Sequence, residues 1–150
     1  MTWAPHVTVA AIIEDEGKFL FVEENTTTGI KLNQPAGHLE PNETIIAAVI
    51  RETQEETART VEPHYLTGIY RIFSSDNDCT YLRFCFYCKV ISHDEQQALD
   101  PDIIRTLWLT ENEITQNQNM HRSPLVLQCL SDYIAGQHYP LSLLHDELVK

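Results

Sequence analysis

The stretch that decides the fold runs from residue 37 to residue 58 and reads GHLEPNETIIAAVIRETQEETA. Its middle part is apolar at positions 45–49, and neither glycine nor proline follows before Thr57. This pattern predicts a helix over residues 45–57. Thr44 stands directly before the apolar run and carries a hydroxyl suited to accept a hydrogen bond from the first turn, so we expect it to be the N-cap.

Three carboxylates of this predicted helix share one face. Because each helical residue is rotated by about 100° from the one before, Glu52, Glu55 and Glu56 lie within about 100° of one another. Like charges at this spacing repel, and a purely solvated face would avoid the repulsion by alternating Glu with Lys. A bound divalent cation turns the repulsion into attraction. The cluster therefore predicts a site for Mg²⁺, for which Mn²⁺ can substitute, since both ions take oxygen ligands.

Residues upstream of the helix complete the expected site. A strand that ends at Pro35-Ala36-Gly37 can bring the Gly37 carbonyl close to the same cation, because no side chain stands in the way. Glu43 and Arg51 have the charges for an ion pair that would hold the loop against the helix.

These residues resemble the Nudix box, whose pattern is Gly, five residues, Glu, seven residues, then Arg-Glu-aliphatic-x-Glu-Glu-x-Gly-aliphatic. The chain has every charged or glycine anchor of the pattern up to Glu56 at the right spacing. It departs from the pattern at three positions, where Thr53, Ala58 and Arg59 stand in place of an aliphatic residue, a glycine and another aliphatic residue. None of these is a ligand position. Because glycine usually ends this helix in a left-handed turn, Ala58 suggests that the helix runs on or exits differently.

The resemblance implies an α/β (α+β) fold, a Nudix-type sandwich of a mixed β-sheet between helices. We expect one such domain over residues 1–150. The implied activity is hydrolysis of a phosphoanhydride in a nucleoside diphosphate linked to another group. The expected metal ligands are the Gly37 carbonyl, Glu52, Glu55 and Glu56. Glu52 matches the carboxylate thought to orient or deprotonate water, and Glu43 and Arg51 complete the expected catalytic set.

Further segments resemble a phosphatase branch of the family that acts on nucleoside di- and triphosphates and on the thiamine pyrimidine diphosphate precursor. These segments are residues 5–10, 16–20, 33–40 and 122–126. Two alternatives stay open: a generic Nudix pyrophosphohydrolase of nucleoside triphosphates or ADP-ribose, and a silent nucleotide-binding domain. Retention of Glu52, Glu55 and Glu56 together favours a hydrolase, because a binding module has no need to keep all three.

Candidate substrate contacts lie outside the box. Arg83, in a predicted strand, either meets a phosphate or points to solvent. Asn33 either binds substrate or ends a strand, and Asp100 and Asp102 either supply a further acid or form an exposed turn. Trp108 is expected in the core rather than as a platform for a base.

The rest of the chain is predicted to be strands followed by helices. The expected strands are a hairpin of residues 6–13 and 18–23, a short strand at 30–34, a hairpin of 65–73 and 81–91, and a strand at 106–109. Two later helices are expected, one opened by the capping box of Thr110 and Glu113, the other begun by Ser123 and Pro124 and closed by Gly136.

The amino-acid composition limits the kinds of molecule that the protein is expected to bind. Ten Lys and Arg against 22 Asp and Glu give a net charge of −12, which repels nucleic acid polymers and anionic membranes. No stretch approaches the roughly 18 apolar residues of a membrane span. We therefore expect a cytoplasmic monomer or weak homodimer that acts on small phosphorylated molecules. Cys85 and Cys88 are three apart in a predicted strand and so point to opposite faces, which favours ordinary cysteines over zinc ligands.

Overall fold

The computed structural model describes residues 2–147, so Met1 and residues 148–150 of the expected domain lie outside the described part. The first sheet has the strand order β5-β1-β7-β6-β9, with bounds β5 Ala36–His38, β1 His6–Ile12, β7 Cys79–His93, β6 Arg59–Ser74 and β9 Tyr139–Pro140. β1 and β7 run parallel, and the other pairs are antiparallel. In the second sheet, β2 (Glu14–Asp15), β4 (Gly29–Asn33) and β8 (Ile103–Thr110) all pair antiparallel with β3 (Lys18–Thr26).

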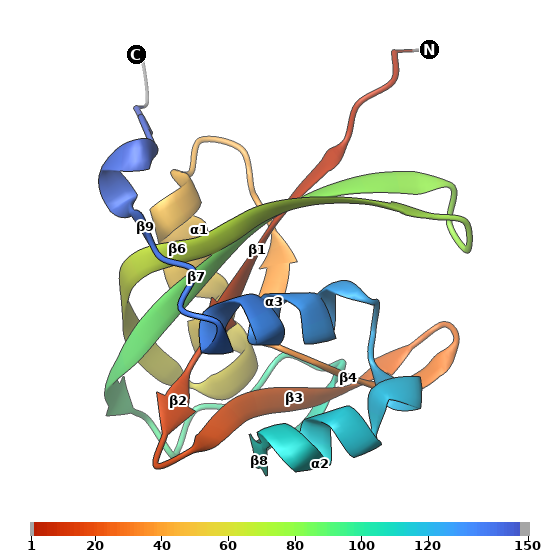
Figure 1. Ribbon diagram of the computed structural model, residues 1–150, viewed down its shortest axis with the longest axis vertical. Helices are drawn as coiled ribbons and strands as arrows, with labels where there is room; N and C mark the ends of the chain where they lie inside the picture. The colour runs from red at the N-terminus through yellow and green to blue at the C-terminus, as the bar shows by residue number, and fades with distance from the viewer. Residues whose placement is uncertain (1, 148–150) are drawn as a thin grey trace.

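Helices cover both faces of the first sheet, as expected for the sandwich. α1 (Ile45–Thr57) lies behind the sheet in Figure 1, and α3 (Leu125–Ile134) lies in front of it. The short helices are α2 (Glu111–Gln116), η1 (Gln118–Met120) and η2 (Leu141–Leu143). β1 shows why both layers are needed: Ala10 packs into the core that α3 covers, and Val9 packs into the core that α1 covers. Alternate residues of a strand point to opposite faces, so the continuous apolar run at residues 9–12 of this central strand needs cover on both sides.

The helix α1 has the predicted bounds and the predicted N-cap. The Thr44 hydroxyl accepts a hydrogen bond from the Ala47 amide at 3.1 Å. The expectation that Ala58 changes the end of the helix is wrong, because Ala58 itself adopts the left-handed conformation (φ 57°, ψ 24°) and its amide donates to Gln54 O at 2.9 Å. A left-handed conformation costs a residue with a Cβ about 1–2 kcal/mol, which the surrounding structure must offset.

The predicted pairing of the first two strands is wrong. β1 lies between β5 and β7, and of the two strands β1 and β2 that precede the turn only the two-residue β2 pairs with β3. The sequence pattern marked both segments as strands, but a pattern of apolar residues does not identify the partner strand. The second hairpin is confirmed: β6 and β7 pair from Arg59 opposite His93 to Ser74 opposite Cys79.

The C-terminal helices begin close to where they were predicted. The capping box of Thr110 and Glu113 is present in both directions. α3 begins at Leu125, one residue later than expected, and the Ser123 hydroxyl accepts from the Leu125 amide at 3.2 Å. Gly136 follows the helix with φ 85° and so ends it as predicted.

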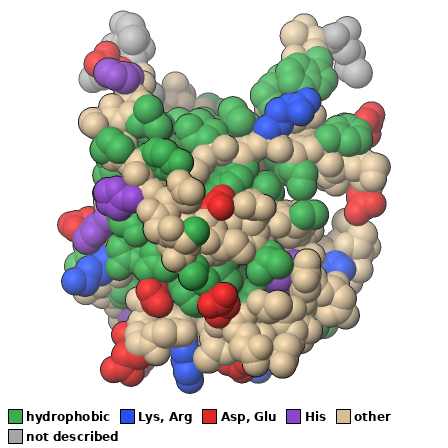
Figure 2. Space-filling model, in the orientation of Figure 1, with side chains coloured by type: hydrophobic (Ala, Val, Ile, Leu, Met, Phe, Trp, Pro, Cys, Tyr) green, Lys and Arg blue, Asp and Glu red, His purple; other side chains and the backbone are tan. Residues whose placement is uncertain are grey.

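Acidic side chains gather along the lower part of the face seen in Figure 2, while hydrophobic side chains lie over its middle and upper parts. Cys85 and Cys88 are both buried, one in the core beneath α3 and the other in the core beneath α1, which confirms that they point to opposite faces. No helix within residues 2–147 is long and apolar enough to cross a membrane.

Candidate active site

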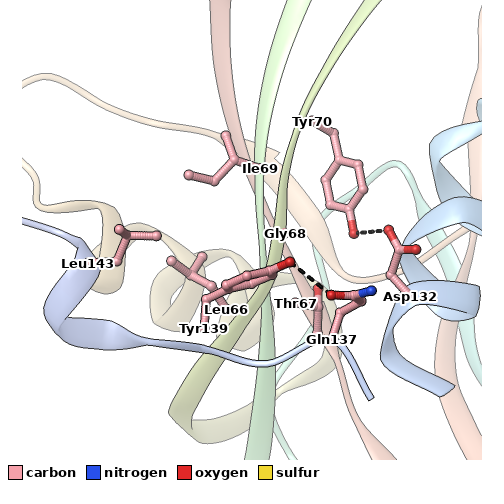
Figure 3. Close-up of a pocket in the computed structure, with 9 residues that line it drawn as sticks. All are labelled: Leu66, Thr67, Gly68, Ile69, Tyr70, Asp132, Gln137, Tyr139 and Leu143. Atoms are coloured by element: carbon pink, nitrogen blue, oxygen red, sulfur yellow. Dashed lines mark hydrogen bonds between the residues drawn. The ribbon is translucent and has the colours of Figure 1, made fainter. Parts of the chain in front are cut away.

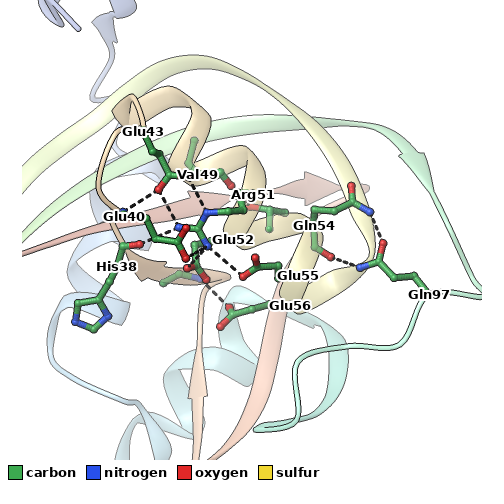
Figure 4. A network of polar contacts seen from close by, with 12 residues as sticks. His38, Glu40, Glu43, Val49, Arg51, Glu52, Gln54, Glu55, Glu56 and Gln97 are labelled. Carbon is green, nitrogen blue, oxygen red and sulfur yellow. Dashed lines mark hydrogen bonds and ion pairs between the residues drawn. The ribbon is translucent and has the colours of Figure 1, made fainter. Parts of the chain in front are cut away.

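Arg51 is the centre of a polar network at the C-terminal half of α1 (Figure 4). Its Nε and Nη2 donate to the two carboxylate oxygens of Glu43 at 2.7 and 2.9 Å, so the predicted ion pair is confirmed. The hydrogen bond from Arg51 lowers the pKa of Glu43. Nη2 also donates to the His38 carbonyl at 2.9 Å. Arg51 thereby ties both ends of the loop between β5 and α1 to the helix.

The carboxylates of Glu52, Glu55 and Asp100 meet at one point. They offer oxygen atoms that all lie within 4.8 Å of one another. Arg51 Nη1 donates to Glu52 at 2.8 Å and to Glu55 at 3.1 Å, which partly offsets their repulsion. The Asp100 amide donates to the Glu55 carbonyl at 3.0 Å and fixes the loop beside the helix. Asp102 is exposed, and its carbonyl accepts from the Asn25 amide at 2.8 Å, so the structure brings only Asp100 to the cluster.

Glu56 lies deeper than the other acids. Its side chain is 8% exposed, and Oε1 accepts from the Ala36 amide at 2.9 Å. Burial raises its pKa to about 9, and the charges of Glu24 and Glu52 add to this rise. Burial also raises the pKa of Glu52. Burial therefore disfavours the charged form of both carboxyls, and a bound cation would favour it.

Gly37 is required by close packing rather than by its backbone angles. A Cβ at this position would collide with the Glu52 carboxyl group. The β5 backbone and the Glu52 carboxylate therefore approach each other with no side chain between them. Together with Glu55 and Asp100 this gives a set of hard oxygen donors, and such a set fits Mg²⁺ or Mn²⁺.

The departures from the family pattern are accommodated without touching the carboxylates. Thr53 is fully buried, and its hydroxyl donates to the Val49 carbonyl one turn earlier at 2.8 Å. Arg59 is 9% exposed, donates to the Thr57 carbonyl at 3.1 Å, and holds its guanidinium carbon 5.6 Å from the centre of the Trp108 ring. Trp108 is partly buried against the core beneath α1, as expected.

Arg83 is buried, which excludes the second of the two alternatives for it, that it points to solvent. It is 6% exposed, and its guanidinium donates to Gln34 Oε1 at 3.2 Å, Asn33 Oδ1 at 3.3 Å and Cys129 Sγ at 3.8 Å. None of these partners is a carboxylate. A buried cation without a carboxylate partner retains a strong attraction for an anion.

Sequence analysis missed Glu24 and Arg122. Glu24 is 7% exposed; its Oε1 accepts from Arg122 Nη1 at 2.8 Å and from Asn33 Nδ2 at 3.4 Å. Its charge also raises the pKa of Glu56 on α1. The one signal in the sequence was that Glu24 lies four residues after Leu20 in a strand and so points to the same face as Leu20. This signal is weak, because residues 19–22 are all buried and the two faces of the strand do not differ in burial.

A separate cavity of about 420 Å³ lies between β6, the end of α3 and the segment that follows it (Figure 3). Its one acidic side chain, Asp132, accepts a hydrogen bond from the Tyr70 hydroxyl at 2.7 Å. Tyr139 donates to Gln137 at its rim at 2.8 Å. No residue of the carboxylate cluster lines this cavity, so it is distinct from the candidate active site.

The fold and the carboxylate cluster agree with comparisons to known proteins. A model of the NUDIX domain matches residues 4–128. The chain therefore belongs to the Nudix hydrolase family, whose members act on small phosphorylated molecules and generally use a divalent metal.

Comparison with individual proteins shows which members of the family the chain resembles. The chain is 40% identical over 142 residues to Phosphatase NudJ of Escherichia coli strain K12, which covers 95% of this chain and 92% of that protein. Phosphatase NudJ of Shigella flexneri matches equally well. Among solved structures, a NUDIX hydrolase from Nitrosomonas europaea is 52% identical with a TM-score of 0.92, covering 95% of this chain and 97% of that one.

Proposed function

We propose that the protein is a Mg²⁺-dependent phosphatase that releases orthophosphate from small diphosphates and triphosphates. The proposed substrates are nucleotides and the pyrimidine diphosphate precursor of thiamine. The observation that carries the proposal is the meeting of Glu52, Glu55 and Asp100 oxygens within 4.8 Å, beside the buried Glu56. The 40% identity to proteins named Phosphatase NudJ supports the choice of a phosphatase.

Each residue of the site has a role in this proposal. Glu52, Glu55, Glu56 and the Gly37 carbonyl hold the divalent ion, and Asp100 extends this set of ligands. A bound divalent ion neutralises phosphate charge and lowers the pKa of a bound water. Of the carboxylates, Glu52 orients or deprotonates the attacking water, since Arg51 Nη1 donates to Oε1 of Glu52 and leaves Oε2 available.

Glu43, Arg51 and Arg83 act around this centre. Glu43 and Arg51 are positioning residues, because they hold the loop between β5 and α1 against the helix. Arg83 binds a phosphate oxygen, because it is buried without a carboxylate partner. Asn33 aligns the Arg83 guanidinium for this contact.

Contacts of this kind recognise the phosphate groups of a nucleotide rather than its base. Metal ligands and Arg83 meet groups that all nucleoside di- and triphosphates share, so selectivity among bases should be loose. Several nucleotides should then be hydrolysed with comparable efficiency. A generic pyrophosphohydrolase and a silent nucleotide-binding domain are the competing functions.

The test is to incubate the protein and Mg²⁺ with GTP, GDP, ADP-ribose, a diadenosine polyphosphate and the pyrimidine diphosphate, and to identify the products by chromatography. We expect orthophosphate from GTP, GDP and the pyrimidine diphosphate. Pyrophosphate from GTP, or a preference for ADP-ribose of about a hundredfold (~2.7 kcal/mol), would favour the generic pyrophosphohydrolase. Binding of the nucleotides without turnover of any of them would favour the silent domain.

A further inference from the structure

Three rings from three strands of the first sheet meet next to the carboxylate site. His6 begins β1, His38 ends β5, and Tyr81 lies beside His6 on β7. The ring centres are 5.5 Å apart for His6 and His38, 5.6 Å for His6 and Tyr81, and 6.2 Å for His38 and Tyr81. We call these three side chains the ring cluster. Both histidines are exposed, so the cluster is not part of the core.

The ring cluster adjoins both the active site and a cavity. His38 directly follows Gly37, and its carbonyl accepts from Arg51 at 2.9 Å, while its ring points away from the carboxylates (Figure 4). His6 and His38 line an open surface cavity together with Pro5, Leu39 and Pro41, and Tyr81 lies beside His6 outside this lining.

The strand pairing places the ring cluster next to Arg83. Tyr81 and Arg83 are two residues apart on β7, and Arg83 and His38 both lie opposite Thr8 of β1. A substrate with its phosphates at the carboxylates and Arg83 therefore has the ring cluster within reach of its other end.

The chemistry of the cluster fits a planar heterocycle. Imidazole nitrogens donate and accept hydrogen bonds, and the nitrogens of His6 and His38 already approach to 3.4 Å. The Tyr81 hydroxyl accepts from Asn77 Nδ2 at 2.6 Å, which holds this ring in place. Exposed, fixed aromatic rings bind heterocyclic bases by stacking, and this interaction tolerates different bases.

We propose that His6, His38 and Tyr81 form the subsite for the heteroaromatic group of the substrate, a pyrimidine or similar planar ring, while its phosphates occupy the carboxylate site. This inference rests on the proposed function and adds a determinant of specificity to it. It predicts that the enzyme distinguishes diphosphates that carry a ring from those that do not.

The kinetic test compares UDP with methyl diphosphate, which has no ring. The variants are His6→Ala and Tyr81→Leu, and Tyr81→Phe keeps the ring. His6→Ala and Tyr81→Leu should lower kcat/KM for UDP tenfold or more, mainly through KM, and change kcat/KM for methyl diphosphate less than twofold. Tyr81→Phe should retain activity on UDP. The matched control is His64→Ala, because His64 is a histidine on β6 that pairs with Glu62 and lines no part of this cavity. Equal losses on both substrates would overturn the proposal.

A second readout does not depend on turnover. Titration of UMP into the wild-type protein should shift the imidazole Cε1–H resonance of His6, identified by its loss in His6→Ala, and orthophosphate should not shift it. If the wild type hydrolyses neither substrate but UMP shifts this resonance, the proposed function fails and the subsite stands. If UDP is hydrolysed but UMP leaves the resonance unchanged, the subsite is refuted and the proposed function stands.

Discussion

Replacing Glu56 by Gln removes a charge while keeping the volume of the side chain. Gln can still accept the Ala36 amide hydrogen bond that Glu56 Oε1 accepts at 2.9 Å. Burial raises the pKa of the wild-type carboxyl to about 9 in the folded protein, against 4.5 for a free Glu. A raised folded pKa contributes stability below pH 4.5, and this contribution is lost as the pH rises toward 9.

The size of the change in stability follows from the pH range between these two pKa values. Each pH unit inside it removes up to ~1.4 kcal/mol from the stability of the metal-free protein. Gln does not titrate, so Glu56→Gln should be more stable than the wild type in chelator, by a margin that grows from pH 5 to pH 8. A margin of 1 kcal/mol corresponds to a Tm shift of about 2–4 °C in a protein of this size.

The assay is thermal unfolding in chelator at pH 5, 6, 7 and 8. Glu95→Gln is the matched control, since Glu95 is exposed in the loop before β8. Its Tm difference from the wild type should not vary with pH. A Glu56→Gln difference that is likewise constant with pH would refute the argument from burial.

The same variant also tests the metal assignment. Loss of one ligand from a metal site acting on phosphate should cost on the order of 3–4 kcal/mol of transition-state stabilisation, so turnover should fall several hundredfold while the fold is retained. Near-wild-type turnover of Glu56→Gln in saturating Mg²⁺ would contradict the assignment of Glu56 as a ligand.

Three further predictions concern the metal, Arg83 and Ala58. Activity should vanish with chelator and return with Mg²⁺ or Mn²⁺. The prediction would be contradicted if protein purified without added metal held stoichiometric zinc and if removal of this zinc abolished activity, which would point to Cys85 and Cys88. Arg83→Gln should raise KM for nucleoside diphosphates about tenfold or more, because a charge-assisted hydrogen bond contributes about 1.5–3 kcal/mol, and an unchanged KM in steady-state kinetics would place phosphate elsewhere. Ala58→Gly should stabilise the protein by about 0.5–1 kcal/mol in urea unfolding, since glycine adopts φ 57° without strain. A loss of stability would show that burial of the Ala58 methyl group contributes more than the strain costs.

Local patterns predicted the elements that are stabilised by local contacts. The bounds of α1 and its N-cap Thr44 were correct because the cap, the apolar run and the absence of breakers all act within a few residues. The capping box at Thr110 and the turn of the hairpin between β6 and β7 were found for the same reason. The Glu43–Arg51 pair also joins residues only eight apart.

Contacts between distant segments could not be predicted in this way. β1 pairs with β7, about 75 residues later, and no apolar pattern specifies that partner. Asp146 Oδ2 accepts from the Ile45 amide at 2.6 Å, so the first turn of α1 is capped from a segment 101 residues away. The same limit applies to Glu24 and Arg122, which form their ion pair across 98 residues.

The two glycine positions of the family pattern show which departures a site tolerates. At Gly37, any side chain would occupy the space of the Glu52 carboxyl group, so a substitution would displace the catalytic oxygens themselves. At position 58, glycine is favoured only because the turn is left-handed, and Ala58 adopts that turn with a modest conformational cost. The penalty at Ala58 affects the stability of the fold, while a penalty at Gly37 would affect the geometry of the reaction. A chain can therefore lose the second glycine and keep its chemistry, because α1 still ends at Thr57 and still presents Glu52, Glu55 and Glu56 to β5 and the Asp100 loop.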